Sequence, residues 1–343
     1  MTRCALPWLL LFGTVPLACG FDRQLLGVAE GSAGSAGSAG NAGAAGSGGE
    51  PTTVSVGQYA ACATRAGNLY CWGNLDHGSD ATTGGAVLST PQPLGTTQGW
   101  ARVELGDRFA CAQRSSALYC WGNSELGQLG LGDLVARTTP ELVGGLAAVA
   151  SFDVGYSHAC AVTTDGALYC WGDNVWGRLG LGPDRTETPL PSPQRVGDAN
   201  DWMQVAAGQY HTCGLRQPGT LYCWGINSSG NLGQGTASDT PVPSPLQVGV
   251  RSDWVELSAG QGDTCARSAA GEVWCWGSWG ETPVSVLSPT QIVLEAPAVA
   301  LSTEVFHRCV LAGDGRAWCW GRNIEGQLGL GDLEPRAAPT LLP

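Results

Sequence analysis

The chain contains no lysine, and all 17 of its basic residues are arginine. Chemistry that needs a lysine amine, such as Schiff-base formation, is therefore excluded. Charged residues make up only 13% of the 343 residues, and the formal net charge at pH 7 is −12. This charge repels phosphate backbones, and the arginines form no cluster along the sequence. Nucleic acid is therefore not an expected partner.

The sequence signatures of common catalytic and cofactor sites are also missing. It has no Gly-x-Ser-x-Gly, no phosphate-binding Gly-rich loop and no His-Glu-x-x-His, and no Cys-x-x-Cys pair suggests a zinc site. The acidic residues are scattered without paired spacing. We therefore expect no enzyme activity, no cofactor and no metal.

The N-terminus has the pattern of an export signal. Arg3 precedes an apolar run, Ala5–Ala18, which is too short to span a bilayer comfortably. The run ends in Val15–Cys19, which resembles the lipobox of bacterial lipoproteins, although Pro16 stands where that motif prefers leucine. The resemblance implies a signal peptide over residues 1–18, cleaved before Cys19, and a lipid on the Cys19 sulfur. An ordinary secretory leader, cut nearby, is the alternative.

A spacer follows the signal. Residues 31–50 read GSAGSAGSAGNAGAAGSGGE and contain no large apolar side chain to bury. We therefore expect residues 19–53 to form a lipidated N-terminus and a disordered linker, and residues 54–343 to form the folded body. These features place the protein in the cell envelope, as an outer-membrane lipoprotein that faces the periplasm or the outside.

One short motif recurs through the rest of the chain. The tripeptide Cys-Trp-Gly occurs six times, and its tryptophans at positions 72, 121, 171, 224, 276 and 320 indicate a repeat of about 50 residues. Each unit reads as four short strands separated by Gly-rich turns. The third strand carries apolar residues on both faces, as in Leu168–Trp171, so it must be covered on both sides. This pattern predicts an all-β propeller of four-stranded blades.

The units resemble the repeat of the regulator of chromosome condensation family, in which a Trp-Gly strand is followed by a Gly-Gln-Leu-Gly turn. Segments 125–133 and 325–332 match that turn closely, and 177–180 matches it less fully. We favour six blades, with the seven blades of better-known relatives as the alternative. We also expect the C-terminal segment Pro339–Pro343 to pair with Val54–Val56 and close the ring.

Twelve cysteines form six pairs with a spacing of 9 or 10 residues. Facing residues of an antiparallel hairpin are close enough for a disulfide, so we predict one disulfide in each blade, with an even-length turn at spacing 9 and an odd one at spacing 10. The pairs are Cys62 and Cys71, Cys111 and Cys120, Cys160 and Cys170, Cys213 and Cys223, Cys265 and Cys275, and Cys309 and Cys319.

Two kinds of side chain remain as candidates for a role in binding. His158, His211 and His307 occupy one position of the repeat, so we interpret them as structural hydrogen-bonding residues. Trp176 and Trp279 lie outside the repeat pattern, in loops after third strands, and are candidates for a binding surface.

The function expected from these features is binding. Loops that connect strands would form a docking face for an envelope protein or a polymer. The family resemblance suggests a second candidate, an inhibitor of an extracellular enzyme, because a secreted bacterial propeller of this family blocks β-lactamase. It also suggests a third, nucleotide exchange on small GTPases, which export and acidity disfavour. We expect a monomer.

Overall fold

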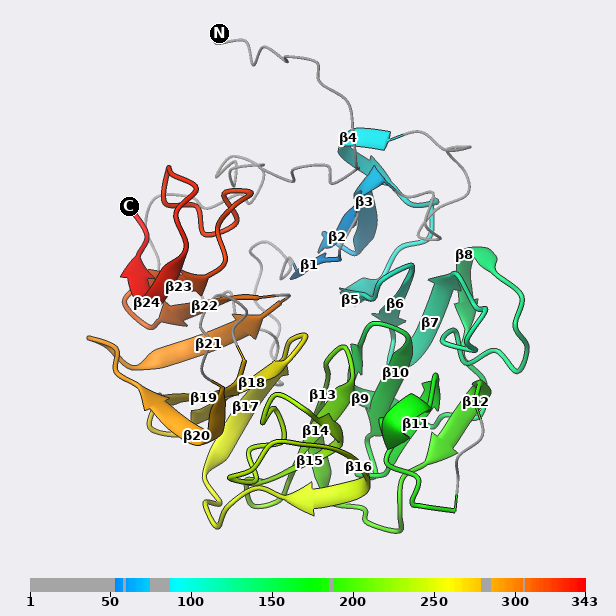
Figure 1. Ribbon diagram of the computed structural model, residues 1–343. Helices are drawn as coiled ribbons and strands as arrows, with labels where there is room; N and C mark the ends of the chain where they lie inside the picture. Colours follow the sequence, from blue (N-terminus) through cyan, green and yellow to red (C-terminus); the bar gives the residue numbers. More distant parts are fainter. Residues whose placement is uncertain (1–52, 58–59, 75–86, 185–187, 279–284, 305) are drawn as a thin grey trace, which may run out of the picture.

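A computed structural model describes residues 53–57, 60–74, 87–184, 188–278, 285–304 and 306–343. These residues form six four-stranded antiparallel sheets arranged as the blades of a propeller (Figure 1). Each blade consists of four strands that are consecutive in the chain. No helix of the described part is both long and apolar enough to cross a membrane.

In every blade the first strand lies nearest the middle of the ring and the fourth lies at the outside (Figure 1). The strands are, for blade 1, β1 (Thr53–Val56), β2 (Ala60–Arg65), β3 (Asn68–Asn74) and β4 (Val87–Pro93); for blade 2, β5 (Trp100–Leu105), β6 (Phe109–Arg114), β7 (Ala117–Gly122) and β8 (Arg137–Leu142); for blade 3, β9 (Val149–Val154), β10 (His158–Thr163), β11 (Leu168–Gly172) and β12 (Leu190–Arg195); for blade 4, β13 (Trp202–Ala207), β14 (His211–Arg216), β15 (Thr220–Asn227) and β16 (Ser238–Gln247); for blade 5, β17 (Trp254–Ala259), β18 (Asp263–Ser268), β19 (Val273–Gly277) and β20 (Val286–Ile292); and for blade 6, β21 (Ala298–Thr303), β22 (His307–Ala312), β23 (Ala317–Gly321) and β24 (Arg336–Leu341).

The second and third strands of each blade are joined by a disulfide between directly facing cysteines. The Cα atoms of each pair are 4.1 or 4.2 Å apart. Spacing 9 gives two-residue turns at 66–67 and 115–116, where φ is positive at both positions as a type I′ turn requires. Spacing 10 gives odd loops, such as the three residues 217–219. The predicted relation between spacing and turn length is therefore confirmed.

The hydrophobic core is divided into five clusters, and each cluster fills the space between two successive blades. We call the side of a blade that faces the preceding blade its leading face, and the opposite side its trailing face. Between blades 2 and 3, for example, Leu118 and Leu129 of the trailing face pack with Phe152 and Trp171 of the leading face. The same kinds of residue meet in the other four clusters.

The predicted ring closure is wrong. β24 pairs with β23 and β1 pairs with β2, so the segment Pro339–Pro343 does not pair with Val54–Val56. Each repeat supplies all four strands of its own blade, which leaves no place in blade 1 for a strand from the C-terminus. The expectation of six blades, by contrast, is confirmed.

Candidate functional site

The loops at one face of the ring gather the exposed aromatic residues. Because neighbouring strands are antiparallel, the turn after each first strand and the loop after each third strand emerge on the same face. Trp176 lies in the loop of blade 3, within the 3-10 turn Val175–Gly177. Tyr156 and Tyr210 lie in the turns that follow β9 and β13. We call these three residues the aromatic platform.

Trp176 and Tyr210 connect two neighbouring blades across the platform. Their rings meet edge to face, with centroids 5.1 Å apart and an interplanar angle of 89°. Trp176 is nevertheless 42% exposed, and Tyr156 is 41% exposed. Exposed aromatic rings on ordered backbone are the type of residue that dominates protein–protein contacts. The prediction that Trp176 lies on an exposed loop surface agrees with this geometry.

The buried side chain of Arg178 packs against two rings of the platform. Its guanidinium lies 5.4 Å from the ring centroid of Trp176 and 5.5 Å from that of Tyr210. Its Nη1 donates hydrogen bonds of 3.0 Å to Ser157 Oγ and 3.1 Å to the carbonyl oxygen of Gln209. These bonds attach the loop of blade 3 to the turns that carry Tyr156 and Tyr210.

The charge of Arg178 is balanced by one carboxylate. Arg178 is only 2% exposed and forms an ion pair of 3.2 Å with Asp173. Burial lowers the pKa of the Arg178 guanidinium, and Asp173 opposes this shift. Cation–π contact with two rings adds about 0.5–2 kcal/mol in such sites. The platform therefore rests on a buried and ordered support.

The backbone of Trp176 is strained. Its φ of 62° and ψ of 19° lie in the left-handed region, which bulky residues rarely adopt. Such a conformation costs on the order of 1–3 kcal/mol and persists only where the surroundings impose it. Trp176 holds this conformation while its indole is exposed, and strained backbone of this kind clusters at functional sites.

The sequence did not predict Arg178, Tyr156 or Tyr210. Arg178 replaces the glutamine of the Gly-Gln-Leu-Gly turn that blades 2 and 6 carry as Gln128 and Gln327. This departure from the repeat was the available signal. The other predicted residues, Trp279 and Cys19, lie outside the described residues.

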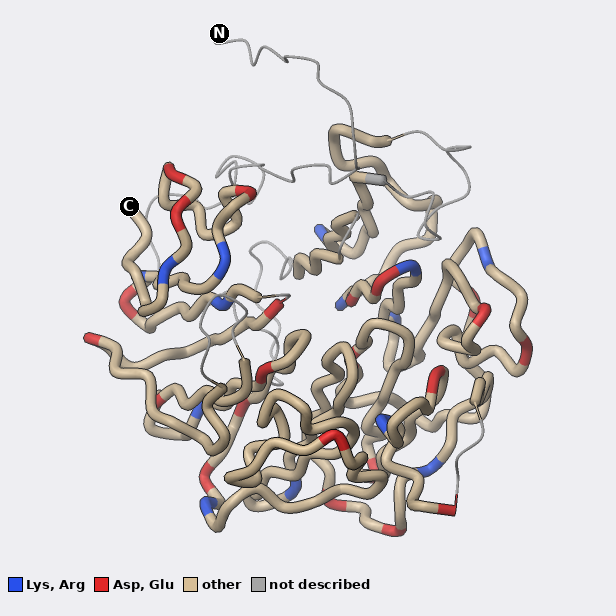
Figure 2. Tube along the Cα trace, in the orientation of Figure 1, with Lys and Arg blue, Asp and Glu red and all other residues tan. Residues whose placement is uncertain are grey.

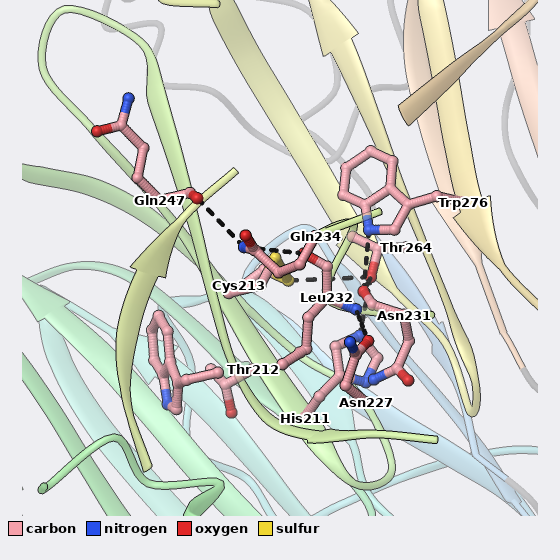
Figure 3. Close-up of a disulfide and its surroundings, with 12 residues drawn as sticks. His211, Thr212, Cys213, Asn227, Asn231, Leu232, Gln234, Gln247, Thr264 and Trp276 are labelled. Carbon is pink, nitrogen blue, oxygen red and sulfur yellow. Dashed lines mark hydrogen bonds between the residues drawn. A yellow bond between two sulfur atoms is a disulfide. The ribbon is translucent and has the colours of Figure 1, made fainter. Parts of the chain in front are cut away.

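The predicted structural role of the histidines is confirmed for two of them. His158 Nε2 and His211 Nε2 each lie 2.8 Å from a threonine hydroxyl of the next blade, Thr212 and Thr264 respectively. Burial lowers the pKa of His211 to about 3 and that of His158 well below its usual range, so both rings are neutral at pH 7. Figure 3 shows His211 and Thr264 near the disulfide of Cys213, where Trp276 Nε1 donates a 2.9 Å hydrogen bond to the Asn231 carbonyl oxygen.

Carboxyl groups gather near the axis of the ring, which the sequence also did not predict. Burial and the neighbouring Glu104 raise the pKa of Asp153 to about 7, although Asp153 accepts a 2.8 Å hydrogen bond from the backbone N–H of Ala207. Burial and the charges of Glu104, Asp153 and Asp263 raise the pKa of Glu304 to about 8. Among the described residues, no group of three or more His, Cys, Asp or Glu side chains could hold a metal ion.

Charged residues are dispersed over the molecule. Figure 2 shows arginines interspersed with acidic residues around the ring. Many arginines pair with an acidic residue, such as Arg137 with Asp133 at 2.7 Å and Arg336 with Asp332 at 2.6 Å. The platform is therefore distinguished by its exposed aromatic rings and not by net charge.

Comparison with known proteins agrees with this architecture. The family model described as an RCC1-like domain matches residues 17–343. The chain belongs to the RCC1-like domain family. The regulator of chromosome condensation of Mus musculus is 36% identical to the chain over 86 residues, which cover 25% of the chain and 20% of that protein. The mitochondrial RCC1 domain-containing protein RUG3 of Arabidopsis thaliana is 29% identical over 90 residues, or 26% of the chain and 20% of that protein. Each match thus spans about a fifth of the relative's length.

Solved structures show the same fold across most of the chain. Human WBSCR16 superposes with a TM-score of 0.75 at 19% identity, covering 86% of this chain and 82% of that one. Prp20p of Saccharomyces cerevisiae superposes with a TM-score of 0.75 at 20% identity, covering 85% and 76%. Propellers of the RCC1-like type generally serve as regulators or binding modules.

Proposed function

We propose that this propeller is a protein-binding module whose contact surface is centred on the aromatic platform of Tyr156, Trp176 and Tyr210. The observation that carries the proposal is Trp176 itself, which is exposed, strained and supported by a buried arginine. An interface hot spot has this composition, since aromatic side chains on rigid support lose little entropy on binding.

Structural relatives support a protein as the partner. Yeast RCC1 has been solved bound to Kap60, and Prp20p is described with binding properties toward Gsp1p and histones. Those partners belong to those proteins. For this chain, the acidic balance and the export signal favour a protein of the cell envelope.

A comparison of two variants tests the platform. We expect Trp176→Ala to reduce capture of envelope proteins by the full chain at least about tenfold, equivalent to 1.4 kcal/mol. The matched control is Val250→Ala, at a residue that is 95% exposed in the connection between β16 and β17, on the opposite face of the ring. Equal capture of the same proteins by wild type and Trp176→Ala would contradict the proposal.

We further propose that the chain is anchored to a membrane through a lipid on Cys19, with the Gly/Ser/Ala-rich segment as its tether. The sequence Val15–Cys19 and the segment that follows support this proposal. Cys19→Ala is expected to move the protein from the membrane fraction to the soluble fraction and to abolish labelling by a radioactive fatty acid. Retention of Cys19→Ala in the membrane fraction would contradict the anchor and leave the binding module untouched.

A further inference from the structure

We propose that the edge between blade 6 and blade 1 is a self-association surface, where blade 1 of a second copy of this chain packs on blade 6. The other five blade interfaces define what such a contact contains. In each one, an apolar residue of a first strand and a Cys-Trp-Gly tryptophan cover the trailing face of the preceding blade. We call the edge between blades 6 and 1, where the described residues form no such cluster, the seam.

In the part of the chain that the structure describes, the leading face of blade 1 is more exposed than that of any other blade. Val54 is 41% exposed, whereas the residues at the same position of blades 2 to 6 are 1% to 5% exposed. Those five residues are Val103, Phe152, Val205, Leu257 and Leu301. Trp72 is only half-buried, although the equivalent tryptophans of the other blades are at most 2% exposed. Val56 is also exposed, at 43%.

The trailing face of blade 6 lacks the corresponding tryptophan among the described residues. A Cβ atom at Gly130 or Gly180 would lie 2.6 or 2.7 Å from the indole nitrogen of the tryptophan in the next blade. Gly329 occupies the same position of the repeat in blade 6. A Cβ atom there would come no closer than 3.9 Å to another atom, Leu342 Cδ2 of its own blade.

Glu304 explains why one copy does not close on itself. Five blades carry glycine at this position, because the backbone of the next blade approaches there. A Cβ atom at Gly155 would lie 2.3 Å from the Gly208 carbonyl oxygen, and one at Gly260 would lie 2.8 Å from the Glu304 carbonyl oxygen. Blade 6 has Glu304 instead, and if blade 1 followed blade 6 as the other blades follow one another, the Gly57 carbonyl oxygen would meet the Glu304 Cβ.

A second copy satisfies both halves of the seam without this conflict. Closure within one copy would bring all six turns together at the axis, where Glu304 obstructs it. Blade 1 of another molecule need not share that axis, so its Val54, Val56 and Trp72 can pack on blade 6 while the backbone at Gly57 stays clear of Glu304. The contact is heterologous, and each copy retains one free edge, so association proceeds head to tail. This proposal differs from the expectation of a monomer.

A pair of introduced cysteines tests which molecule fills the seam. Ser258 Oγ of blade 5 and Thr303 Oγ1 of blade 6 are 2.9 Å apart, and Ser302 and Val56 occupy the equivalent positions at the seam. In the full chain we expect Val56→Cys/Ser302→Cys to give disulfide-linked dimers and larger species on a non-reducing gel. The control pair Ser258→Cys/Thr303→Cys should give only intrachain disulfides. Each single-cysteine variant should remain uncrosslinked.

Removal of Glu304 provides the decisive comparison. In the Glu304→Gly background the same cysteine pair should change from interchain to intrachain disulfides, and the sedimentation mass should fall to that of one copy. Val54→Asp should also give a single-copy mass. The control variant Val250→Asp should associate as the wild type does. Intrachain cross-linking with Glu304 present would overturn the proposal. A single-copy mass for the wild type at the concentration used for cross-linking would also overturn it.

Discussion

The indole nitrogen of Trp224 donates a 2.9 Å hydrogen bond to the backbone carbonyl oxygen of Arg178, the residue whose side chain supports the aromatic platform. One residue thus takes part in both the packing between blades 3 and 4 and the candidate binding surface. Its backbone carbonyl joins the two blades, and its side chain packs against the rings of the candidate site. These two roles can be separated by substitution, because only the side chain changes.

Arg178→Gln restores the residue that blades 2 and 6 carry in this turn, so the backbone bond to Trp224 should persist. Loss of the guanidinium leaves the carboxylate of Asp173 without its buried partner, which costs about 3 kcal/mol. We expect the free energy of unfolding to fall by this amount in urea titrations. The double variant Arg178→Gln/Asp173→Asn should recover part of the loss. Equal stability of Arg178→Gln and wild type would contradict the supporting role.

At position 176, we expect the usual stability order of alanine and glycine variants to be reversed. Glycine adopts the left-handed conformation without strain, whereas alanine retains the cost. We therefore expect Trp176→Gly to be more stable than Trp176→Ala by about 1 kcal/mol, measured by urea unfolding. The same pair of substitutions at Leu126, the equivalent residue of blade 2, serves as the control, and there alanine should be the more stable. The same order at both sites would contradict the strain at Trp176.

Glu304 should make stability depend on pH. Its pKa is raised to about 8 in the folded protein by burial and by Glu104, Asp153 and Asp263, compared with an ordinary value of about 4.3 in the unfolded chain. The folded state therefore holds the proton more tightly, and its stability falls as the pH rises from about 4.3 to about 8. Glu304→Gln should remove this part of the decline. The free energy of unfolding is measured by urea titration at several pH values for the wild type and Glu304→Gln. The same dependence on pH in both proteins would contradict the prediction.

His211 should act in the opposite direction. Burial lowers its pKa to about 3, compared with an ordinary value of about 6.5 in the unfolded chain. The unfolded state therefore binds the proton first, and stability falls as the pH decreases from about 6.5 to about 3. His211→Gln should be less stable than wild type at pH 7, because it disturbs the bond to Thr264, but its stability should decline less on acidification. A decline as steep as that of the wild type would contradict this assignment.

The repeat pattern predicted the fold because it is local. Cysteine spacing determined the hairpins, and the Cys-Trp-Gly strand, apolar on both sides, indicated blades packed face to face. The candidate site was harder to predict from the sequence. Trp176 was recognised because it departs from the repeat, but Tyr210 belongs to the next repeat and meets Trp176 only in the folded ring.

Ring closure could not be predicted for a similar reason. The expectation that the C-terminal segment would pair with Val54–Val56 assumed that a propeller must share a blade between its ends. In the arrangement that we propose, the contact between blade 1 and blade 6 depends on the space around one residue, Glu304, and this space exists only after six blades have formed. A sequence repeat contains no information about the space between blades 6 and 1.

The glycine at the turn after the first strand of blades 1 to 5 therefore provides space as well as conformational freedom. At five of these turns the backbone of the next blade approaches a glycine closely, and Glu304 stands at the same position of blade 6. Under the proposed head-to-tail association, the size of this one side chain determines whether another blade of the same chain can follow. Exchange of glycine and a larger residue at this turn would be a simple way to shorten or extend a propeller, with no change in any strand.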